Sequence, residues 1–263
     1  MRLAESAIEK AFRLATFKRL GSTNDEALAR AEAGDPGALW VVAAEQAGGK
    51  GRQGRTWVSP PGNLYASLLL IDPGPPRNMP ELGFVAGVAL ARSLRDILGG
   101  DTRICIKWPN DILHNGCKLS GILLESLKLP DGKFACVIGI GVNCSSHPQN
   151  LAYKATDLAE IGSLLADAEQ VFLRLSAELA HWLDIWDRGR GFQAIRMEWL
   201  LLAAGIGTQI KVSAPFRTME GLFRTIDSAG RLILETEAGP IAVEAGDIFL
   251  SNPPKGTLAA HVS

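Results

Sequence analysis

The feature that most constrains the fold is a series of short apolar runs separated by glycine, proline or asparagine. Five of these runs have strand length and β-branched content: 38–44, 63–71, 102–108, 118–126 and 134–143. Between the second and third runs, residues 80–100 place apolar side chains at helical spacing and end in a glycine pair. The pattern predicts a sheet with a helix covering one of its faces.

Helical signals flank this series on both sides. Thr23 is followed three places later by Glu26, the spacing of a capping box, and Gly34 comes after them, so a helix is expected over about 24–33. From 168 to 202, two further stretches keep the helical period. The predicted main domain therefore spans residues 1–204.

The pattern changes after Gly205 and Gly207 to short strands, with a DSAG turn at 227–230. This change predicts a small β-barrel over residues 205–252. The last segment, 253–263, begins with a proline pair and lacks apolar periodicity, so a flexible tail is expected there.

Composition narrows the class of protein. Hydrophobic residues make up 47% and charged residues 21% of the chain, and the net charge of −1 gives no general attraction to nucleic acid or acidic membranes. The longest apolar stretch, 200–207, is too short to span a bilayer, and the N-terminal segment has no signal-peptide run. The four cysteines lack metal-binding spacing. We expect a cytoplasmic protein with reduced thiols.

One local stretch departs from this neutral balance. GGKGRQGR, residues 48–55, interleaves Lys50, Arg52 and Arg55 with four glycines. Exposed backbone N–H groups and guanidinium forks can hold phosphate or carboxylate oxygens, so the stretch suits an anion, although a solvated basic loop is the alternative. The order differs from the Walker A pattern. Without a partner, a loop this rich in glycine and positive charge has little reason to adopt one conformation.

Two further signals lie on the strands. Asp111 and Lys118 stand at opposite ends of a hairpin-like connection, DILHNG, and are expected to come within reach of each other. For Lys118 alone, a stem that only carries its charge to water is the simpler interpretation. Gly139 and Gly141 alternate with aliphatic residues inside a strand, which indicates the close approach of a backbone or a flat ligand.

Six motifs together resemble the biotin protein ligase family. They are STN at 22–24, EQAGGKGRQGRTW at 45–57, SPPGNLYAS at 59–67, KWPND at 107–111, KLSGIL at 118–123 and IGIGVN at 138–143. The resemblance covers nearly the whole chain. It implies an α+β fold with a mixed sheet flanked by helices, as in class II aminoacyl-tRNA synthetases and biotin ligases, and a small C-terminal SH3-like β-barrel.

The resemblance implies a two-step ligase reaction. Biotin and MgATP give biotinyl-5'-AMP and pyrophosphate, and a lysine of a biotin carboxyl carrier domain, from acetyl-CoA carboxylase or a related carboxylase, then takes the biotinyl group as an amide. Biotin and ATP with Mg²⁺ are substrates, and no tightly bound metal, nucleic acid or membrane is expected. Both a monomer and a homodimer fit. The family's N-terminal helix-turn-helix domain is not expected, because only about 20 residues precede GSTNDEA.

The same resemblance assigns catalytic roles. Lys118 and Arg52 are expected to offset the repulsion between the biotin carboxylate and the α-phosphate of ATP. Asp111 is a candidate for orienting the incoming lysine, although KWPND can also be a strand that ends in a proline turn with Asp111 as a cap.

The implied binding residues surround the two substrates. The ureido ring of biotin is expected at Ser22, Thr23 and Gln46, although Thr23 can also serve as a helix cap. Trp57 is expected over the adenine and Asn143 at the nucleotide. The full set is Ser22, Thr23, Asn24, Gln46, Lys50, Gly51, Arg52, Arg55, Trp57, Lys118, Gly121, Gly139, Gly141 and Asn143.

The chain departs from the family's GRGRxGR pattern at Lys50, which stands in place of the first arginine. Lysine keeps the charge and loses the planar fork, so activity is expected to survive. The alternatives are a lipoate ligase, a non-catalytic biotin-sensing regulator and an RNA-binding module. The complete GKGRQGR and KWPND motifs favour a biotin ligase, and the net charge opposes RNA binding.

Overall fold

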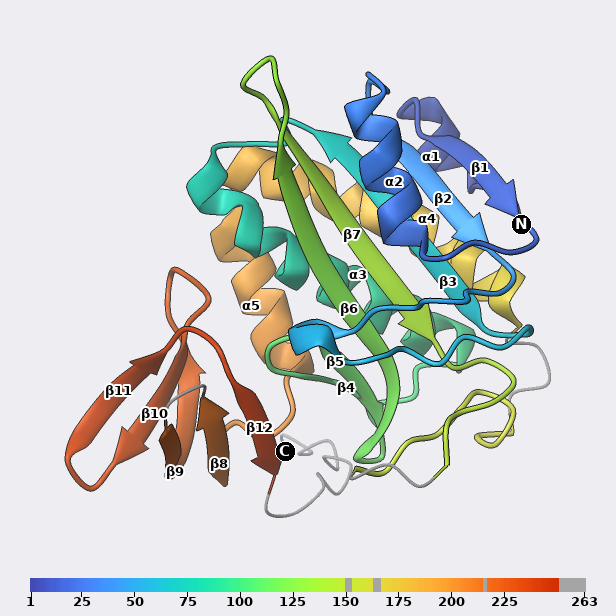
Figure 1. The fold of residues 1–263 in the computed structure, drawn as a ribbon. Helices are drawn as coiled ribbons and strands as arrows, with labels where there is room; N and C mark the ends of the chain where they lie inside the picture. Colours follow the sequence, from blue (N-terminus) through green and yellow to red (C-terminus); the bar gives the residue numbers. More distant parts are fainter. Residues whose placement is uncertain (150–152, 163–166, 215–216, 251–263) are drawn as a thin grey trace, which may run out of the picture.

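The computed structural model describes residues 1–149, 153–162, 167–214 and 217–250. These residues form a large α+β domain and a smaller all-β domain that lie side by side (Figure 1). The segment 253–263, expected to be a tail, lies outside the described residues.

The large domain is built on a seven-stranded mixed sheet with the order β1-β2-β3-β7-β6-β5-β4. β1 runs parallel to β2, and every other neighbouring pair is antiparallel. The strands are β1 (Arg13–Phe17), β2 (Leu39–Ala43), β3 (Leu64–Ile71), β4 (Ile104–Lys107), β5 (Asp111–His114), β6 (Cys117–Lys128) and β7 (Phe134–Val142). The mixed sheet and the five predicted strands are confirmed.

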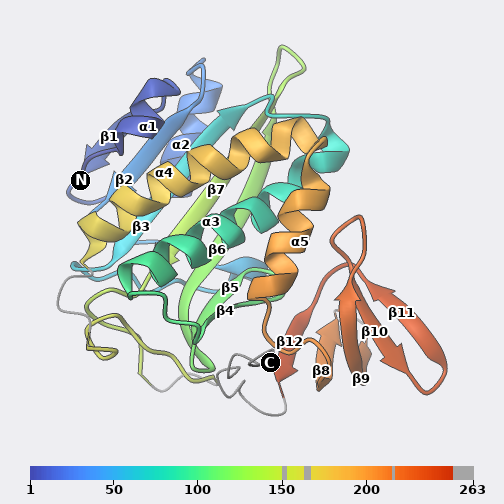
Figure 2. The ribbon, with the colours of Figure 1, turned by 180° about the vertical axis from the view of Figure 1, so that it is seen from behind.

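Helices cover both faces of this sheet. One face carries α3 (Leu82–Ile97), α4 (Ala168–Trp186) and α5 (Phe192–Leu202), as Figure 2 shows. The other face carries α2 (Thr23–Glu32), and the short α1 (Glu5–Glu9) packs beside α4. Short 3₁₀ turns are η1 (Arg52–Gly54), η2 (Pro76–Glu81) and η3 (Asp187–Gly189). Among the described residues, no helix combines the length and apolar character that crossing a bilayer requires.

The alternation of side chains along β3 and β7 divides the core in two. Leu64, Ala66 and Leu68 point to the α3–α4–α5 face and join the main core, which contains Trp40, Trp186 and Trp199. Leu69, Val137 and Ala135 point to the α2 face and pack with Ala27 and Ala31 of α2 in a smaller core. This division follows from the two-residue period of a strand.

Three local predictions need correction. The N-cap of α2 is Ser22, whose hydroxyl accepts a long hydrogen bond from the Asp25 N–H at 3.5 Å, so Thr23 is not the cap. Residues 111–114, expected as part of a connection, form strand β5, and the chain then turns at Asn115 and Gly116, both at positive φ. β1 and α1 were not predicted, because their few apolar residues lie among charged ones.

The small domain is a five-stranded antiparallel sheet with the order β11-β10-β9-β8-β12. Its strands are β8 (Gln209–Ala214), β9 (Arg217–Ile226), β10 (Leu232–Thr236), β11 (Gly239–Val243) and β12 (Asp247–Leu250). The segment 240–250, expected as one strand, is divided between β11 and β12. The all-β prediction is confirmed, and closure into a barrel stays a prediction.

Candidate active site

The α2 face of the sheet is hollow beyond the end of the smaller core. There, β3 and β7 replace large apolar residues with Ser67, Gly139 and Gly141, and Gly121 of β6 lies opposite Gly141. The missing side-chain volume leaves an open cavity of about 1050 Å³. α2, the sheet, the loop around η1 and strand β12 together form its walls.

A set of amides and hydroxyls, the amide–hydroxyl network, forms one end of the cavity: Thr23, Asn24, Gln46, Ser59 and Ser67. The Gln46 carbonyl oxygen accepts from the Thr23 N–H at 2.8 Å and from its hydroxyl at 3.1 Å, while the Gln46 amide donates to Ser59 Oγ at 3.0 Å. Ser67 Oγ lies 2.7 Å from Thr23 Oγ1 and 2.6 Å from Asn24 Oδ1. These contacts hold uncharged donors and acceptors in fixed positions.

The other end of the cavity, the charged end, centres on Asp111 between two lysines. Lys118 Nζ lies 2.6 Å from Asp111 Oδ1, and Lys107 Nζ lies 3.5 Å from Asp111 Oδ2. The expected approach of Asp111 and Lys118 is therefore confirmed. The Lys118 ammonium also lies 5.5 Å from the centre of the Trp57 ring and 5.3 Å from that of Tyr153, within the range of cation–π attraction.

The cationic loop between residues 48 and 57 closes over this end. Gly51 N–H donates to the Arg55 carbonyl at 2.7 Å, and Gln53 and Gly54 turn the chain at φ 57° and 72°. Lys50 pairs with Asp25 of α2, Arg52 donates to Asn110 Oδ1 at 3.0 Å, and Arg55 lies 3.2 Å from Asp247. The structure thus supplies partners for all three cations that the sequence pattern did not reveal.

These partners also set the protonation of the loop. The hydrogen bond from Asp25 raises the pKa of Lys50, so its charge is secure at neutral pH. Burial lowers the pKa of Arg52, and the carboxylates of Asp247 and Asp111 partly offset that effect. Burial also raises the pKa of Tyr65 to about 12, so this phenol stays protonated and donates to the Pro60 carbonyl at 2.7 Å.

The strand glycines make room for side chains of the chain itself. A Cβ on Gly139 would lie 2.2 Å from Asn24 Oδ1, and one on Gly141 would lie 2.6 Å from the Trp57 ring. A Cβ on Gly121 would lie 3.1 Å from Trp57. Trp57 Nε1 is buried, with no hydrogen-bond partner among the described residues. The close approach predicted from the glycine pattern is present, and here the flat group is the Trp57 indole.

All but one of the predicted site residues line the cavity. The exception is Asn143, which lines an adjoining pocket of about 360 Å³ together with Trp57, Lys118 and Tyr153, and donates to the Thr156 carbonyl at 3.1 Å. The sequence analysis missed several lining residues: Tyr65, Lys107, Asn110, Tyr153, Asp247, Ile248 and Phe249. KWPND contains Lys107 and Asn110, whereas no sequence signal marked β12.

A single group among the described residues has the geometry to hold a metal ion: His147, Asp157 and Glu160. His147 Nδ1 already lies 2.7 Å from Asp157 Oδ2, and the Glu160 N–H donates to Asp157 Oδ1 at 2.7 Å. These contacts account for the cluster as a hydrogen-bonded turn.

Known proteins with the same combination of sheet, cavity and small domain are ligases. The chain matches the Biotin/lipoate A/B protein ligase family over residues 16–143 and the Biotin protein ligase C terminal domain over residues 205–251. The biotin--[acetyl-CoA-carboxylase] ligase of Paracoccus denitrificans is 39% identical over 240 residues, which cover 88% of this chain and 98% of that protein.

Solved structures agree with the sequence comparison. The biotin protein ligase from Aquifex aeolicus, in complex with biotin and ATP, has a TM-score of 0.76 at 26% identity over 90% of this chain and 97% of that one. The Leishmania major enzyme in complex with biotinyl-5-AMP has a TM-score of 0.62 at 25% identity over 89% and 99%. The chain therefore belongs to the biotin protein ligase family.

Proposed function

We propose that this ligase runs both steps of its reaction in the cavity beside α2. In the first step, a biotin carboxylate oxygen bonds to the α-phosphorus of ATP and the bond to the β-phosphate oxygen breaks, which releases pyrophosphate. In the second step, the amine of an acceptor lysine bonds to the acyl carbon, the acyl–phosphate bond breaks and AMP leaves. The amine gives up a proton as the amide forms. Magnesium enters with ATP as part of the substrate.

The contrast between the two ends of the cavity carries this proposal. The ureido ring of biotin is uncharged and both donates and accepts hydrogen bonds, which suits Thr23, Gln46 and the Ser22 hydroxyl beside them. The reacting groups are two anions, and they suit the end that holds Lys118 and the loop cations. The valeryl chain of biotin then runs over Gly121 and Gly139 along the sheet.

Lys118 is assigned to the carboxylate and the α-phosphate. In the first step negative charge gathers between these groups, and a fixed ammonium lowers the barrier because its orientation is set before the reaction. Asp111 sets that orientation through its 2.6 Å contact. Arg52 is assigned to the same region, with Lys50, Gly51 and Arg55 around the acyl phosphate, so that the closed loop keeps water away from the mixed anhydride.

Asp111 has a second assignment in the transfer step. Its carboxylate is buried between Lys107 and Lys118, so it can accept a hydrogen bond from the incoming lysine and aim its nitrogen at the acyl carbon. The adjoining pocket is assigned to the adenine, with Trp57 as its flat wall and Asn143 as its polar group.

A lipoate ligase is the alternative that shares the family description. The dithiolane ring of lipoate offers no strong hydrogen-bond donor. Bound in this cavity, it would leave the polar groups of the amide–hydroxyl network without ligand partners in a site closed to water, and such unpaired groups weaken binding strongly. The buried polar end therefore favours biotin.

The acceptor that we propose is the biotin carboxyl carrier domain of acetyl-CoA carboxylase or a related carboxylase. The names of the relatives, including the Paracoccus denitrificans enzyme, support this choice. We place the catalytic unit at residues 1–204 and the small domain at 205–252, with the enzyme acting in the cytoplasm as a monomer or homodimer. The four cysteines are free thiols, which fits a reducing compartment.

Pyrophosphate exchange tests the first step without an acceptor. The purified protein is expected to exchange labelled pyrophosphate into ATP when biotin is present and to stay at background with lipoate. Addition of a carrier domain is then expected to give an acceptor heavier by one biotinyl group. Exchange that responds to lipoate and ignores biotin would refute the proposal.

A further inference from the structure

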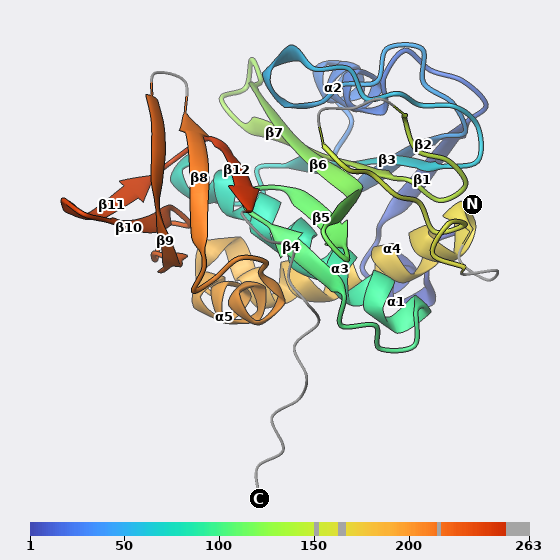
Figure 3. The ribbon, with the colours of Figure 1, turned by 90° about the horizontal axis from the view of Figure 1, so that it is seen from below.

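The small domain contributes directly to the cavity through strand β12. Asp247, Ile248 and Phe249 line it beside the cationic loop, although nearly two hundred residues separate them in sequence. In the view from below, β12 is the strand of the small domain that faces the large sheet (Figure 3). Whatever Asp247 does at the cavity, the small domain therefore does through it.

Asp247 lies between the two arginines of the loop. Its Oδ1 atom is 3.2 Å from Arg55 Nη2 and 3.7 Å from Arg52 Nη1. The neighbouring Gly246 carbonyl accepts from Arg52 Nη2 at 3.4 Å, while Asn110 accepts from Arg52 Nη1 at 3.0 Å. The guanidinium of Arg52 is thus held from two sides, by the KWPND turn and by β12.

These contacts counter a local repulsion. Arg52 is largely buried, and both its burial and the nearby charge of Arg55 disfavour its positive form, whereas Asp247 favours that form. Arg55 is about half exposed and hydrogen-bonds through Nε to the Arg52 carbonyl at 3.1 Å. Without the carboxylate, two guanidinium groups would face the cavity with no opposing charge from the small domain.

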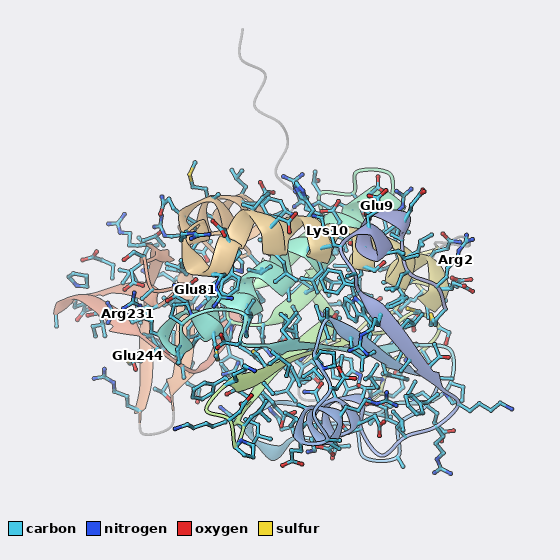
Figure 4. The ribbon with its side chains drawn as sticks, turned by 90° about the horizontal axis from the view of Figure 1, so that it is seen from above. Arg2, Glu9, Lys10, Glu81, Arg231 and Glu244 are labelled. Atoms are coloured by element: carbon cyan, nitrogen blue, oxygen red, sulfur yellow. The ribbon has the colours of Figure 1, made fainter. Side chains whose placement is uncertain are left out.

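The position of Asp247 depends on how the small domain docks. Trp108 Nε1 donates to the Gly230 carbonyl at 3.2 Å, and Arg196 Nε donates to the Ile226 carbonyl at 2.7 Å. A Cβ on Gly230 would lie 2.6 Å from the Phe84 ring, so the two surfaces meet closely. Figure 4 shows Arg231 and Glu244 of the small domain on the side toward Glu81 of the large one.

From this geometry we infer that Asp247 is a positioning residue for adenylation, which holds Arg52 and Arg55 at the cavity until the phosphates of ATP replace its carboxylate as their partner. The inference rests on the proposed function of the site. It gives the small domain a part in the first step of the reaction: docking delivers one carboxylate, and that carboxylate arranges two cations of the other domain.

The test compares Asp247→Asn with the parent protein. Amide hydrogen exchange of residues 50–57 is expected to be faster in the ligand-free variant and equal to the parent with biotin and MgATP bound. Two partly exposed ion pairs are lost, so the KM for ATP in pyrophosphate exchange is expected to rise about three- to tenfold. The kcat is expected to stay within about twofold, because the phosphates have taken over once ATP is bound.

Two further variants separate positioning from general damage. Asp247→Glu restores the charge and is expected to recover most of the ATP affinity. Glu220→Gln removes a carboxylate from the same domain, where it pairs with Lys211 at 3.3 Å, and is expected to leave both readouts unchanged. Unchanged loop exchange and unchanged KM in Asp247→Asn would overturn the inference, as would a lower KM for ATP.

The hydrogen-exchange arm keeps this inference apart from the proposed function. A parent protein without biotin-dependent pyrophosphate exchange would refute the proposed function. The comparison of loop exchange in the free proteins would then still decide whether Asp247 holds the loop.

Discussion

The two ends of the cavity solve opposite problems with different materials. In the amide–hydroxyl network, Thr23, Asn24, Ser59 and Ser67 are all buried, and their contacts are short hydrogen bonds within the large domain. At the charged end, Lys50 and Arg55 are about half exposed, and their partners are carboxylates from α2 and from the small domain. One end is rigid and uncharged, whereas the other is ionic and drawn from separate elements.

The difference follows from what each end must do. A buried, satisfied hydrogen-bond network discriminates sharply, because a ligand that lacks the matching groups leaves polar atoms unpaired. Partly exposed ion pairs are weak, so a phosphate can displace a carboxylate at little cost. We therefore expect substitutions in the network to change biotin affinity and substitutions at the charged end to change rate or ATP affinity.

The largest effect is expected for Lys118→Ala. Loss of a fixed cation beside developing negative charge typically costs about 2–4 kcal/mol of transition-state stabilisation, so adenylation should slow by roughly 10²- to 10³-fold. Single-turnover formation of biotinyl-AMP measures this rate. Lys133→Ala is the matched control, since Lys133 lies in the exposed turn between β6 and β7 and pairs with Asp131 at 2.9 Å. A folded Lys118→Ala enzyme at the parent rate would mean that Lys118 only carries its charge to water.

A smaller effect is expected for Gln46→Ala, and on a different quantity. The change removes an acceptor of two Thr23 hydrogen bonds and a donor to Ser59. Buried groups left unpaired cost about 1–3 kcal/mol, so the Kd for biotin should rise about 10- to 100-fold in calorimetry. Gln170→Ala, at an exposed position of α4, is the control and should bind like the parent. Parent-like affinity in Gln46→Ala would remove Gln46 from the biotin site.

Gly141→Ala tests the place where the two ends meet. Its new Cβ would lie 2.6 Å from the Trp57 ring, so the indole must shift away from the sheet. Overpacking of this kind costs about 1–3 kcal/mol, and we expect a fivefold to tenfold weaker affinity for a biotinyl-AMP analogue. Gly83→Ala in α3, where nothing lies within 4 Å of the new Cβ, should change neither affinity nor stability adversely. Equal affinity in Gly141→Ala would show that the Trp57 position does not matter for binding.

The smallest effect is expected for Lys50→Arg. Lys50 meets Asp25 with a side chain that is 43% exposed, so a guanidinium can keep the same partner. The adenylation rate should stay within about twofold of the parent or rise slightly, because the change restores a planar fork. A loss of tenfold or more, measured by pyrophosphate exchange, would show that this position needs the compact ammonium.

Sequence patterns predicted the fold where local signals were strong. The apolar runs at 63–71 and 134–143 became the central strands β3 and β7, because their β-branched and aliphatic residues suit a buried sheet. β1 was missed, because an edge strand needs few apolar residues and Arg13–Phe17 alternates charge with short apolar positions. The cap of α2 was placed one residue late, since both Ser22 and Thr23 can serve as N-caps.

The site was predicted in part for the same reason. Motifs located the residues that lie close to one another in sequence, such as Lys50, Arg52 and Arg55. The partners of these cations were invisible, because Asp25 and Asp247 reach the loop only through the packing of α2 and the docking of the small domain. Contacts between distant segments are set by tertiary structure and leave no local pattern.

The reciprocal measurement tests the division of labour between the two ends most directly: biotin affinity without ATP for Lys118→Ala, and the single-turnover adenylation rate at saturating biotin and MgATP for Gln46→Ala. The account predicts a biotin Kd within about threefold of the parent for the first variant and a rate within about threefold for the second, because each residue acts at its own end. A Gln46→Ala enzyme that binds biotin normally and adenylates slowly, or a Lys118→Ala enzyme that loses biotin affinity as strongly as it loses rate, would contradict it.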